Sequence, residues 1–396
     1  MGELRCQTQT DESDFNKYVK IIEPIPSLDN LNIGFIGFGL IGGSIARALK
    51  KACPSIKLIA YDYRQNPPSS ELQEALFDQI LDAVTFSLEK DFTECDLIFL
   101  CAPVLSNINY LQKLKPIIKK DCILTDVGSV KGNIHKEVEK LNLQKQFIGG
   151  HPMTGSEKTG YRNSYALLME NAYYILTPTD QTPQDKVDLL YHLVQEIGSI
   201  PILLDAQEHD EITAAISHVP HIIAAQLVNL VKNSDDKAEK MRMLAAGGFK
   251  DITRIASSSP IMWQNICLTN ADSIKALLDS YIESLKKVSL SLSEMDQDYL
   301  FEIFDTAKDY RNSIPNTSKG IIQKVHEIYM DIKDEAGAIA TIATLLAVNQ
   351  ISIKNIGIIH NREFEEGVLR IEFYEEESKD KAAILLKDYN YNLYLR

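Results

Sequence analysis

Three glycines near the start of the chain have a spacing that suits a pyrophosphate. Gly37, Gly39 and Gly42 follow the pattern G-x-G-x-x-G between a strand-like run and a helix-like run. In such a segment the first glycine makes the turn, the second admits the phosphates, and the third lets helix and strand pack closely. Amides at the helix start, including those of Leu40 and Ile41, would face the phosphates. A glycine cluster at a strand end can also be a simple turn, so the residues that follow must distinguish a nucleotide-binding loop from a turn.

A carboxylate further along the chain indicates which dinucleotide would bind. A second strand predicted at 57–61 ends in Asp62, twenty residues after the last glycine of the motif. An acidic residue there accepts both ribose hydroxyls and repels a 2′-phosphate, so NAD is favoured over NADP. Arg64 weakens this preference. Ala102 and Pro103 follow another predicted strand and would lie beside the same cofactor.

A histidine and a serine at two further strand ends are candidates for proton transfer. His151 lies in a glycine-rich loop, and a lone histidine is often structural. A dehydrogenase that oxidises an alcohol, however, needs a group of near-neutral pKa to take the hydroxyl proton as hydride leaves. Ser129 could orient that hydroxyl or the imidazole and touch the cofactor, or it could simply cap a helix.

A second polar group lies in a helical part of the chain. His218 and His221 are three residues apart, but no acidic partner stands at ligand spacing, so no metal site is expected. Arg254 follows a glycine pair that is predicted to break two helices. Its planar fork suits a carboxylate, although it could also bridge to Asp251 or to a helix end.

The segments that carry the glycine motif, Asp62, Ser129 and His151 alternate between predicted strands and predicted helices, as in an open parallel sheet. Strands are predicted at 33–37, 57–61, 96–101, 122–127, 146–150, 173–177 and 200–204. Ligands bind beyond the carboxyl ends of such strands, so the loops named above should meet near the cofactor. We therefore expect an α/β fold with a Rossmann-like domain over residues 30–205, while residues 1–29 stay unassigned.

Residues 206–312 are predicted to form an all-helical substrate and dimerisation domain. A long helical stretch at 206–231 is expected to be interrupted at Pro220. Further on, an apolar stripe recurs at heptad spacing and consists of Ile274, Leu278, Tyr281, Leu285, Val288 and Leu292. Such a stripe either joins two copies of the chain into a homodimer or packs within one copy.

A linker at 313–324 precedes a C-terminal unit over 325–396. Its pattern is a strand at 325–333, a helix at 337–349, strands at 351–361 and 368–374, a helix at 379–388 and a short last strand. This order, β-α-β-β-α-β, is ferredoxin-like.

Composition limits the possible partners and location. The 396 residues are 45% hydrophobic and 24% charged, which suits two or three globular domains. A net charge of −14 argues against nucleic acid and anionic membranes. We see neither an apolar run of membrane-spanning length nor a secretory signal. The six cysteines form no C-x-x-C pair, which favours free thiols and a cytoplasmic location.

Five segments, taken in order, resemble the prephenate dehydrogenase family. They span 37–44, 126–131, 150–160, 217–221 and 247–263, and the C-terminal unit resembles an ACT domain. The most specific pieces are 150–157 and 247–256, and the resemblance covers about residues 31–396. It implies NAD-dependent oxidative decarboxylation of prephenate to 4-hydroxyphenylpyruvate, a step of tyrosine biosynthesis.

The resemblance also assigns roles to single residues. It implies that His151 hydrogen-bonds the ring hydroxyl of prephenate with support from Ser129. It also implies that Arg254 binds a substrate carboxylate and that this arginine can serve the neighbouring subunit's site. Other positions that match the family's pocket are Thr154, Glu157, His221, Gly247 and Asp251.

An effector site is implied by the ACT resemblance, with L-tyrosine held between paired domains. Amides at Gly337 and Ala338 can bind an α-carboxylate, Asp334 can accept the ammonium, and Asn355 could add a polar contact. The alternative is that the unit only promotes dimerisation, with Asp334 as a helix cap.

Rival functions remain at this point. The substrate could be arogenate, whose side chain carries an amino group. A β-hydroxyacid dehydrogenase shares the domain order but usually relies on a lysine in the helical domain, and the His151 loop argues against it. A non-catalytic amino-acid sensor would use the nucleotide site structurally, which the intact His151, Ser129 and Arg254 make a poor explanation.

Overall fold

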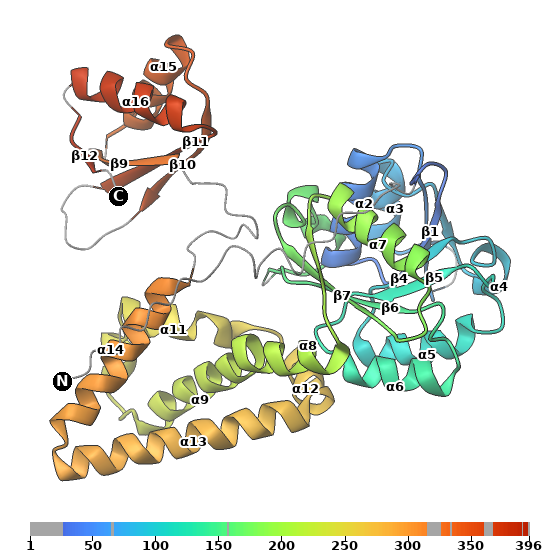
Figure 1. The fold of residues 1–396 in the computed structure, drawn as a ribbon, viewed down its shortest axis with the longest axis horizontal. Coiled ribbons are helices and arrows are strands. Elements are labelled where there is room, and N and C mark those ends of the chain that lie inside the picture. The colour runs from blue at the N-terminus through green and yellow to red at the C-terminus, as the bar shows by residue number, and fades with distance from the viewer. Residues whose placement is uncertain are drawn as a thin grey trace, which may run out of the picture. The chain divides into compact units, whose positions relative to one another are not determined.

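The computed structural model describes residues 27–64, 67–156, 158–314, 326–332, 335–359, 367–389 and 391–394. The chain divides into two compact units, Met1–Gly320 and Ile321–Arg396 (Figure 1). Each unit is described by itself.

A five-stranded parallel sheet forms the start of the first unit, in the order β3-β2-β1-β4-β5. The strands are β1 (Asn32–Ile36), β2 (Lys57–Tyr61), β3 (Ala83–Thr85), β4 (Leu97–Leu100) and β5 (Ile123–Asp126). The central strands are nearly continuous apolar runs because helices cover both faces of the sheet. This is the doubly wound order of a Rossmann-like domain, so the predicted fold class is confirmed, and only β3 was not predicted.

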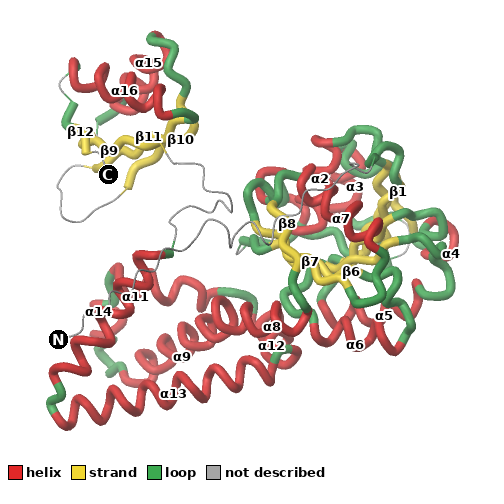
Figure 2. Tube along the Cα trace, in the orientation of Figure 1, coloured by secondary structure: helices red, strands yellow, loops and turns green. Residues whose placement is uncertain are grey.

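Helices flank this sheet in two groups (Figures 1 and 2). They are α2 (Leu40–Ala52), α3 (Ser70–Phe77), α4 (Leu88–Asp91), α5 (Val104–Leu114), α6 (Gly132–Lys140) and α7 (Gln184–Glu196). One apolar cluster joins α2, α3 and α7 to one face, and another joins α5 and α6 to the opposite face. The cofactor loops at the strand ends are therefore mounted on a well-packed body.

The last three strands of this region form a separate sheet, which corrects the prediction of one parallel sheet. β6 (Ile148–Pro152) pairs antiparallel with β7 (Tyr173–Pro178), and β7 pairs parallel with β8 (Ile200–Leu203). Only short 3₁₀ turns lie between β6 and β7, and without a crossover helix the chain returns antiparallel. A bridge between Leu124 and Phe147 connects β5 to the start of β6, so the two sheets adjoin.

Helices make up the rest of the first unit (Figure 2). They are α8 (Ala206–Thr213), the π-turn η3 (Ala214–His218), α9 (Val219–Ser234), α10 (Lys240–Leu244), α11 (Gly247–Thr253), the 3₁₀ turn η4 (Arg254–Ser257), α12 (Pro260–Thr269), α13 (Ala271–Glu294) and α14 (Gln297–Ser313). The helix break expected at Gly247 is wrong, because this glycine begins α11.

The interruption expected at Pro220 is also absent. Ala206–Ser234 runs as one helix of 29 residues, with the π-turn just before the proline. The wider turn accommodates a residue that lacks an N–H and would crowd the preceding carbonyls. Within the described part of the chain this helix alone is long and apolar enough to cross a membrane, a weak indication because core helices pass the same test.

The second unit has the predicted ferredoxin-like element order. Its elements are β9 (His326–Ile332), α15 (Ala338–Val348), β10 (Ile353–Ile359), β11 (Gly367–Phe373), α16 (Glu376–Asp388) and β12 (Leu393–Tyr394). The antiparallel sheet has the order β10-β11-β9-β12. Ile328, Met330, Leu369 and Ile371 are buried on one face in a core shared with both helices.

Candidate active site

The three glycines of the predicted nucleotide motif have the geometry that a pyrophosphate loop needs. Gly37 has φ +87°, and a Cβ there would lie 2.6 Å from the amide nitrogen of Ala102. A Cβ at Gly42 would lie 2.9 Å from the carbonyl oxygen of Gly37, so glycine permits close packing of α2 on the strand end. Nothing lies within 4 Å of the Cβ position of Gly39. The space at the second glycine is thus open, as close approach of a phosphate requires.

A cavity of about 560 Å³ lies at the carboxyl ends of β1, β2 and β4. It brings together six of the predicted cofactor residues, namely Gly37, Gly39, Asp62, Arg64, Ala102 and Pro103. Leu40, Ile41 and Gly42 begin the adjoining helix α2, whereas Ser129 does not line this cavity. Tyr61 and Tyr110 add aromatic walls, with ring centroids 5.9 Å apart.

Asp62 lies at the cavity with its side chain almost fully buried. One carboxylate oxygen accepts the N–H of Arg64 at 3.0 Å and the other accepts the N–H of Ser69 at 2.8 Å. Each carboxylate oxygen has a second lone pair, so ribose hydroxyls can still be accepted. The guanidinium of Arg64 is exposed and lies 5.4 Å from the ring centre of Tyr63.

A buried ion pair that the sequence did not reveal joins the next two strand ends. Asp126, at the end of β5, accepts Nζ of Lys131 at 2.5 Å, and both side chains are buried. The same ammonium donates to the carbonyl oxygen of Gly150 at 2.7 Å, and Asp126 also accepts the N–H groups of Gly128 and Gly150. These bonds fix the loop that carries Ser129 and the residue that precedes His151.

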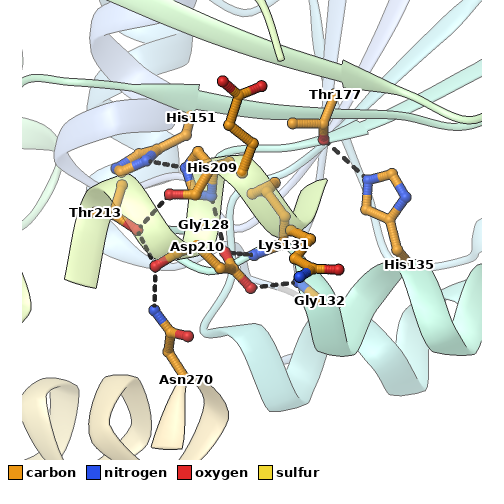
Figure 3. A network of polar contacts seen from close by, with 12 residues as sticks. Gly128, Lys131, Gly132, His135, His151, Thr177, His209, Asp210, Thr213 and Asn270 are labelled. Atoms are coloured by element: carbon orange, nitrogen blue, oxygen red, sulfur yellow. Dashed lines mark hydrogen bonds and ion pairs between the residues drawn. The ribbon is translucent and has the colours of Figure 1, made fainter. Parts of the chain in front are cut away.

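His151 lies in β6 and contacts a second histidine from the helical region (Figure 3). Its Nδ1 is 2.8 Å from Nε2 of His209, and Nδ1 of His209 is 2.8 Å from a carboxylate oxygen of Asp210. Asp210 also accepts the N–H groups of Lys131 and Gly132, both at 2.8 Å. The carboxylate therefore caps α6 from a helix 79 residues away along the chain.

Burial keeps this cluster of histidines neutral. It lowers the pKa of His151 well below 6.5, and the facing His209, Lys131 and His218 lower it further. Burial also lowers the pKa of His209 and brings that of His218 to about 4. For Asp210 burial opposes ionisation, but hydrogen bonds from His209, Lys131 and Gly132 outweigh it and lower its pKa. At neutral pH, His151 is thus a neutral base beside an ionised carboxylate relay.

Ser129 does not cap a helix, because α6 begins at Gly132 and Asp210 supplies the cap. Its hydroxyl makes no hydrogen bond to another described residue and remains available to a ligand. Thr154 is partly buried just after β6. Glu157 lies outside the described residues.

The remaining predicted pocket residues lie in the helical region, where one of them, His221, contacts Trp263. The ring of His221 stacks on this indole with centroids 3.7 Å apart, and His218 meets it edge-on at 6.0 Å. Arg254 begins η4, and its charge is one of the factors, after burial, that lower the pKa of His221. Gly247 and the exposed Asp251 lie on α11 directly before it. No cluster of metal-ligating side chains occurs in the described ranges.

Three of the four predicted effector residues can be located in the C-terminal unit. Gly337 has φ +93° and precedes α15, which Ala338 begins. Asn355 lies at a register shift of β10, and its Nδ2 is 3.4 Å from Oε1 of Glu372. Asp334 lies outside the described residues.

A dinucleotide-type cavity at the ends of a parallel sheet, in a unit that also contains a neutral buried histidine, is typical of a two-domain dehydrogenase. The comparisons with known proteins narrow this class. Family models described as the nucleotide-binding and dimerization domains of prephenate dehydrogenase match residues 45–203 and 205–306.

Individual relatives agree with these matches. Prephenate dehydrogenase of Bacillus subtilis is 38% identical over 348 residues, which cover 87% of this chain and 93% of that protein. Prephenate dehydrogenase of Aquifex aeolicus, solved with hydroxyphenyl propionate and NAD+, superposes with a TM-score of 0.68 at 32% identity, covering 73% of this chain and all of that one. Synechocystis arogenate dehydrogenase gives a TM-score of 0.64 at 28% identity over 72% of this chain and all of that one. The chain belongs to the prephenate dehydrogenase family.

Proposed function

We propose that this enzyme catalyses the NAD-dependent oxidative decarboxylation of prephenate to 4-hydroxyphenylpyruvate. The observation that carries the proposal is the neutral His151, held by its Nδ1 beside a nucleotide domain whose glycine loop and acidic strand end fit NAD. Its other nitrogen is then left to accept a proton from a hydroxyl. The relatives named above include enzymes called prephenate dehydrogenase, one of them solved with NAD+.

The residues of the first cavity suit the cofactor. Gly37, Gly39 and the amides that begin α2 would hold the pyrophosphate, and Asp62 would accept the ribose hydroxyls. Bound NAD accepts a hydride. Ala102 and Pro103 line the cavity towards the β5 loop, because Val104, the next residue, lies 3.2 Å from the Cβ position of Gly128. This contact links the cofactor side of the site to the loop of Ser129.

The chain's own groups then act on the substrate. His151 accepts the proton of the ring hydroxyl as hydride leaves the ring carbon that bears this hydroxyl. Ser129 orients the hydroxyl. The ring carboxylate departs as carbon dioxide, the ring becomes aromatic, and His151 returns the proton to the phenol oxygen. No strong acid is needed, so the main work of the protein is positioning.

An anionic substrate needs a local cation on a protein of net charge −14. We assign this role to Arg254, because Lys131 is fully buried in its pair with Asp126. Thr154, Glu157, His221, Gly247 and Asp251 complete the proposed pocket. We also propose a homodimer, which the match to a dimerization domain and the exposed apolar side chains of α13 support.

We further propose that L-tyrosine regulates the enzyme through an ACT domain over residues 325–396. In this division the nucleotide-binding domain covers 30–205, the helical domain covers 206–312, and a linker covers 313–324. The alignment with the Bacillus protein covers 87% of the chain, more than the first 320 residues could supply, so similarity extends into this unit. Gly337, with its positive φ before a helix, offers amides to an α-carboxylate. Tyrosine inhibition that persists undiminished in a chain ending near Ser318 would contradict this part.

The experiment for the whole proposal measures NADH or NADPH formation with prephenate and arogenate, each with NAD and NADP. We expect prephenate with NAD to give the highest kcat/KM. Arogenate is the second candidate substrate because a relative of similar fold bears that name. A clear preference for arogenate would change the assigned substrate from prephenate to arogenate. The absence of turnover with every combination of substrate and cofactor would overturn the proposal that the protein is this enzyme.

A further inference from the structure

The hydrogen bonds around His151 fix which of its nitrogens carries the proton. Asp210 accepts the backbone N–H groups of Lys131 and Gly132, and an ionised carboxylate can only accept, so Nδ1 of His209 must donate to it. Neutral His209 then has Nε2 as its acceptor, and this atom lies 2.8 Å from Nδ1 of His151. His151 must therefore donate from Nδ1, which leaves its Nε2 unprotonated.

We propose that His209 and Asp210 are positioning residues that set the tautomer and the basicity of His151 through this chain of hydrogen bonds. When Nε2 of His151 takes up positive charge, its Nδ1–H bond to His209 strengthens, and the Asp210 carboxylate stabilises the polarised pair. The relay offsets the burial that otherwise disfavours a charged imidazole.

The surroundings of Asp210 keep its carboxylate ionised, so that it can stabilise the polarised histidine pair. It accepts two N–H groups at the start of α6, where the positive end of the helix favours a negative charge. The other charged or titratable groups that face the histidine pair are Lys131, whose charge is neutralised by Asp126, and His218, which Asn270 contacts at 3.2 Å. Of the described groups that face the pair, only Asp210 is an acceptor hydrogen-bonded to Nδ1 of His209.

The first test reads the tautomers directly and does not require activity. Nitrogen NMR of protein labelled at histidine, with His151 assigned through a His151→Asn variant, should show His151 and His209 both protonated at Nδ1 near neutral pH. In His209→Gln, the Nδ1–H form of His151 should lose its dominance. An Nε2–H tautomer of His151 in the unaltered protein, or one unaffected by His209→Gln, would overturn the relay.

The second test is kinetic and rests on the proposed function. His209→Gln should lower kcat by about 10- to 100-fold, less than loss of the base itself, with KM for prephenate changed little. The acid limb of the kcat/KM profile should move to lower pH because the imidazolium is less stabilised. In a His151→Asn background the same substitution should change kcat less than about 2-fold, since both residues act as one unit.

Thr213→Val is the matched control. The Thr213 hydroxyl donates to the backbone oxygen of His209 at 2.9 Å, on the same helix, without joining the relay. It should leave the pH profile and the tautomers in place even if stability falls. Equal pH shifts in Thr213→Val and His209→Gln would reduce His209 to a structural residue. If the unaltered protein oxidises neither prephenate nor arogenate, the proposed function fails, and the NMR result still decides the relay.

Discussion

The nucleotide-binding half and the helical half of the first unit bury their apolar side chains very differently. The first half has two large clusters on either side of its sheet, with Phe35, Phe99 and Phe147 fully buried. The helical half has one small described cluster, in which only Ala214, Val219 and Ile274 are buried. One half therefore has a core sufficient for its own stability, and the other does not.

The helical half instead exposes apolar residues along α9 to α14. Among those more than half exposed are Leu230, Met243, Leu244, Ile252, Ile261, Leu268, Leu290, Leu292, Met295, Phe301, Phe304 and Tyr310. Of the heptad stripe, Ile274 is buried, whereas Leu285 is 50% exposed. Monomeric proteins rarely leave so much apolar surface uncovered.

This difference divides the proposed site as well. The cofactor cavity and His151 belong to the well-packed half, whereas Arg254, His221 and Trp263 belong to the half that needs a partner. Assembly should therefore control substrate binding more than cofactor binding.

Breaking the stripe should have the largest effect. We expect Leu285→Glu combined with Leu292→Glu to dissociate the proposed dimer, because each leucine buried in its interface contributes about 2 kcal/mol and a charge there adds a desolvation cost. Light scattering should show monomer and the dehydrogenase activity should be lost, while NAD still binds. Phe77→Glu is the control, since this α3 side chain is 87% exposed. A dimer that persists in the double glutamate variant would contradict the inference that the exposed apolar stripe of the helical half forms the interface.

Breaking the ion pair of the well-packed half should cost about 3 to 5 kcal/mol of unfolding free energy. Lys131→Met leaves the Asp126 carboxylate buried and unpaired, and it removes a bond to Gly150. Thermal unfolding should shift clearly, and adding Asp126→Leu should recover part of the loss. Lys140→Met, which breaks an exposed pair with Glu137, should change little. Equal losses from both lysine variants would show that burial is not the cause.

Acid should weaken both halves through their buried histidines, of which His135 and His218 are one example in each half. Burial lowers the pKa of His135 in α6 and of His218 in η3 to about 4, below the value of about 6.5 expected when unfolded. The unfolded chain therefore binds more protons between these values, so stability present above about pH 6.5 is lost as pH falls towards 4. Each histidine accounts for up to about 3 kcal/mol. His135→Gln should flatten the fall in melting temperature between about pH 7 and pH 5, and an unchanged slope would exclude it as a cause.

The smallest effect concerns cofactor choice. Asp62→Ser should raise the NADP to NAD ratio of kcat/KM by about 10-fold, because a carboxylate no longer repels the 2′-phosphate. Only a modest loss of NAD affinity is expected. A native protein that already prefers NADP would mean that the exposed Arg64 outweighs Asp62.

The sequence predicted what local pattern determines. The glycine spacing gave a turn that the contact between Gly37 and Ala102 explains, and the C-terminal element order was confirmed. Pairing direction was less accessible, because β6 and β7 have the same apolar character in either direction. Pro220 predicted a break, but the π-turn that relieves it has no simple sequence signal.

The relay depends on tertiary contacts, whereas the buried pair joins residues only five apart along the chain. His209 lies 58 residues after His151, and Asp210 lies 79 residues after Lys131. The sequence predicted a helix over both residues but no role for either. A weak signal existed for the ion pair, since Lys131 follows a buried strand ending in Asp126 and such a position is unusual for a lysine. The spacing of these residues along the chain did not indicate that Asp126 would pair with Lys131 or that Asp210 would pair with His209.

The central claim is that His151 acts on the hydroxyl while Arg254 holds the substrate. The measurement is steady-state oxidation of prephenate with saturating NAD by His151→Asn and Arg254→Gln, each compared with the unaltered protein. We expect His151→Asn to lower kcat by about 10² to 10⁴ with KM nearly unchanged, and Arg254→Gln to raise KM with a smaller effect on kcat. Unchanged turnover in His151→Asn would contradict the account.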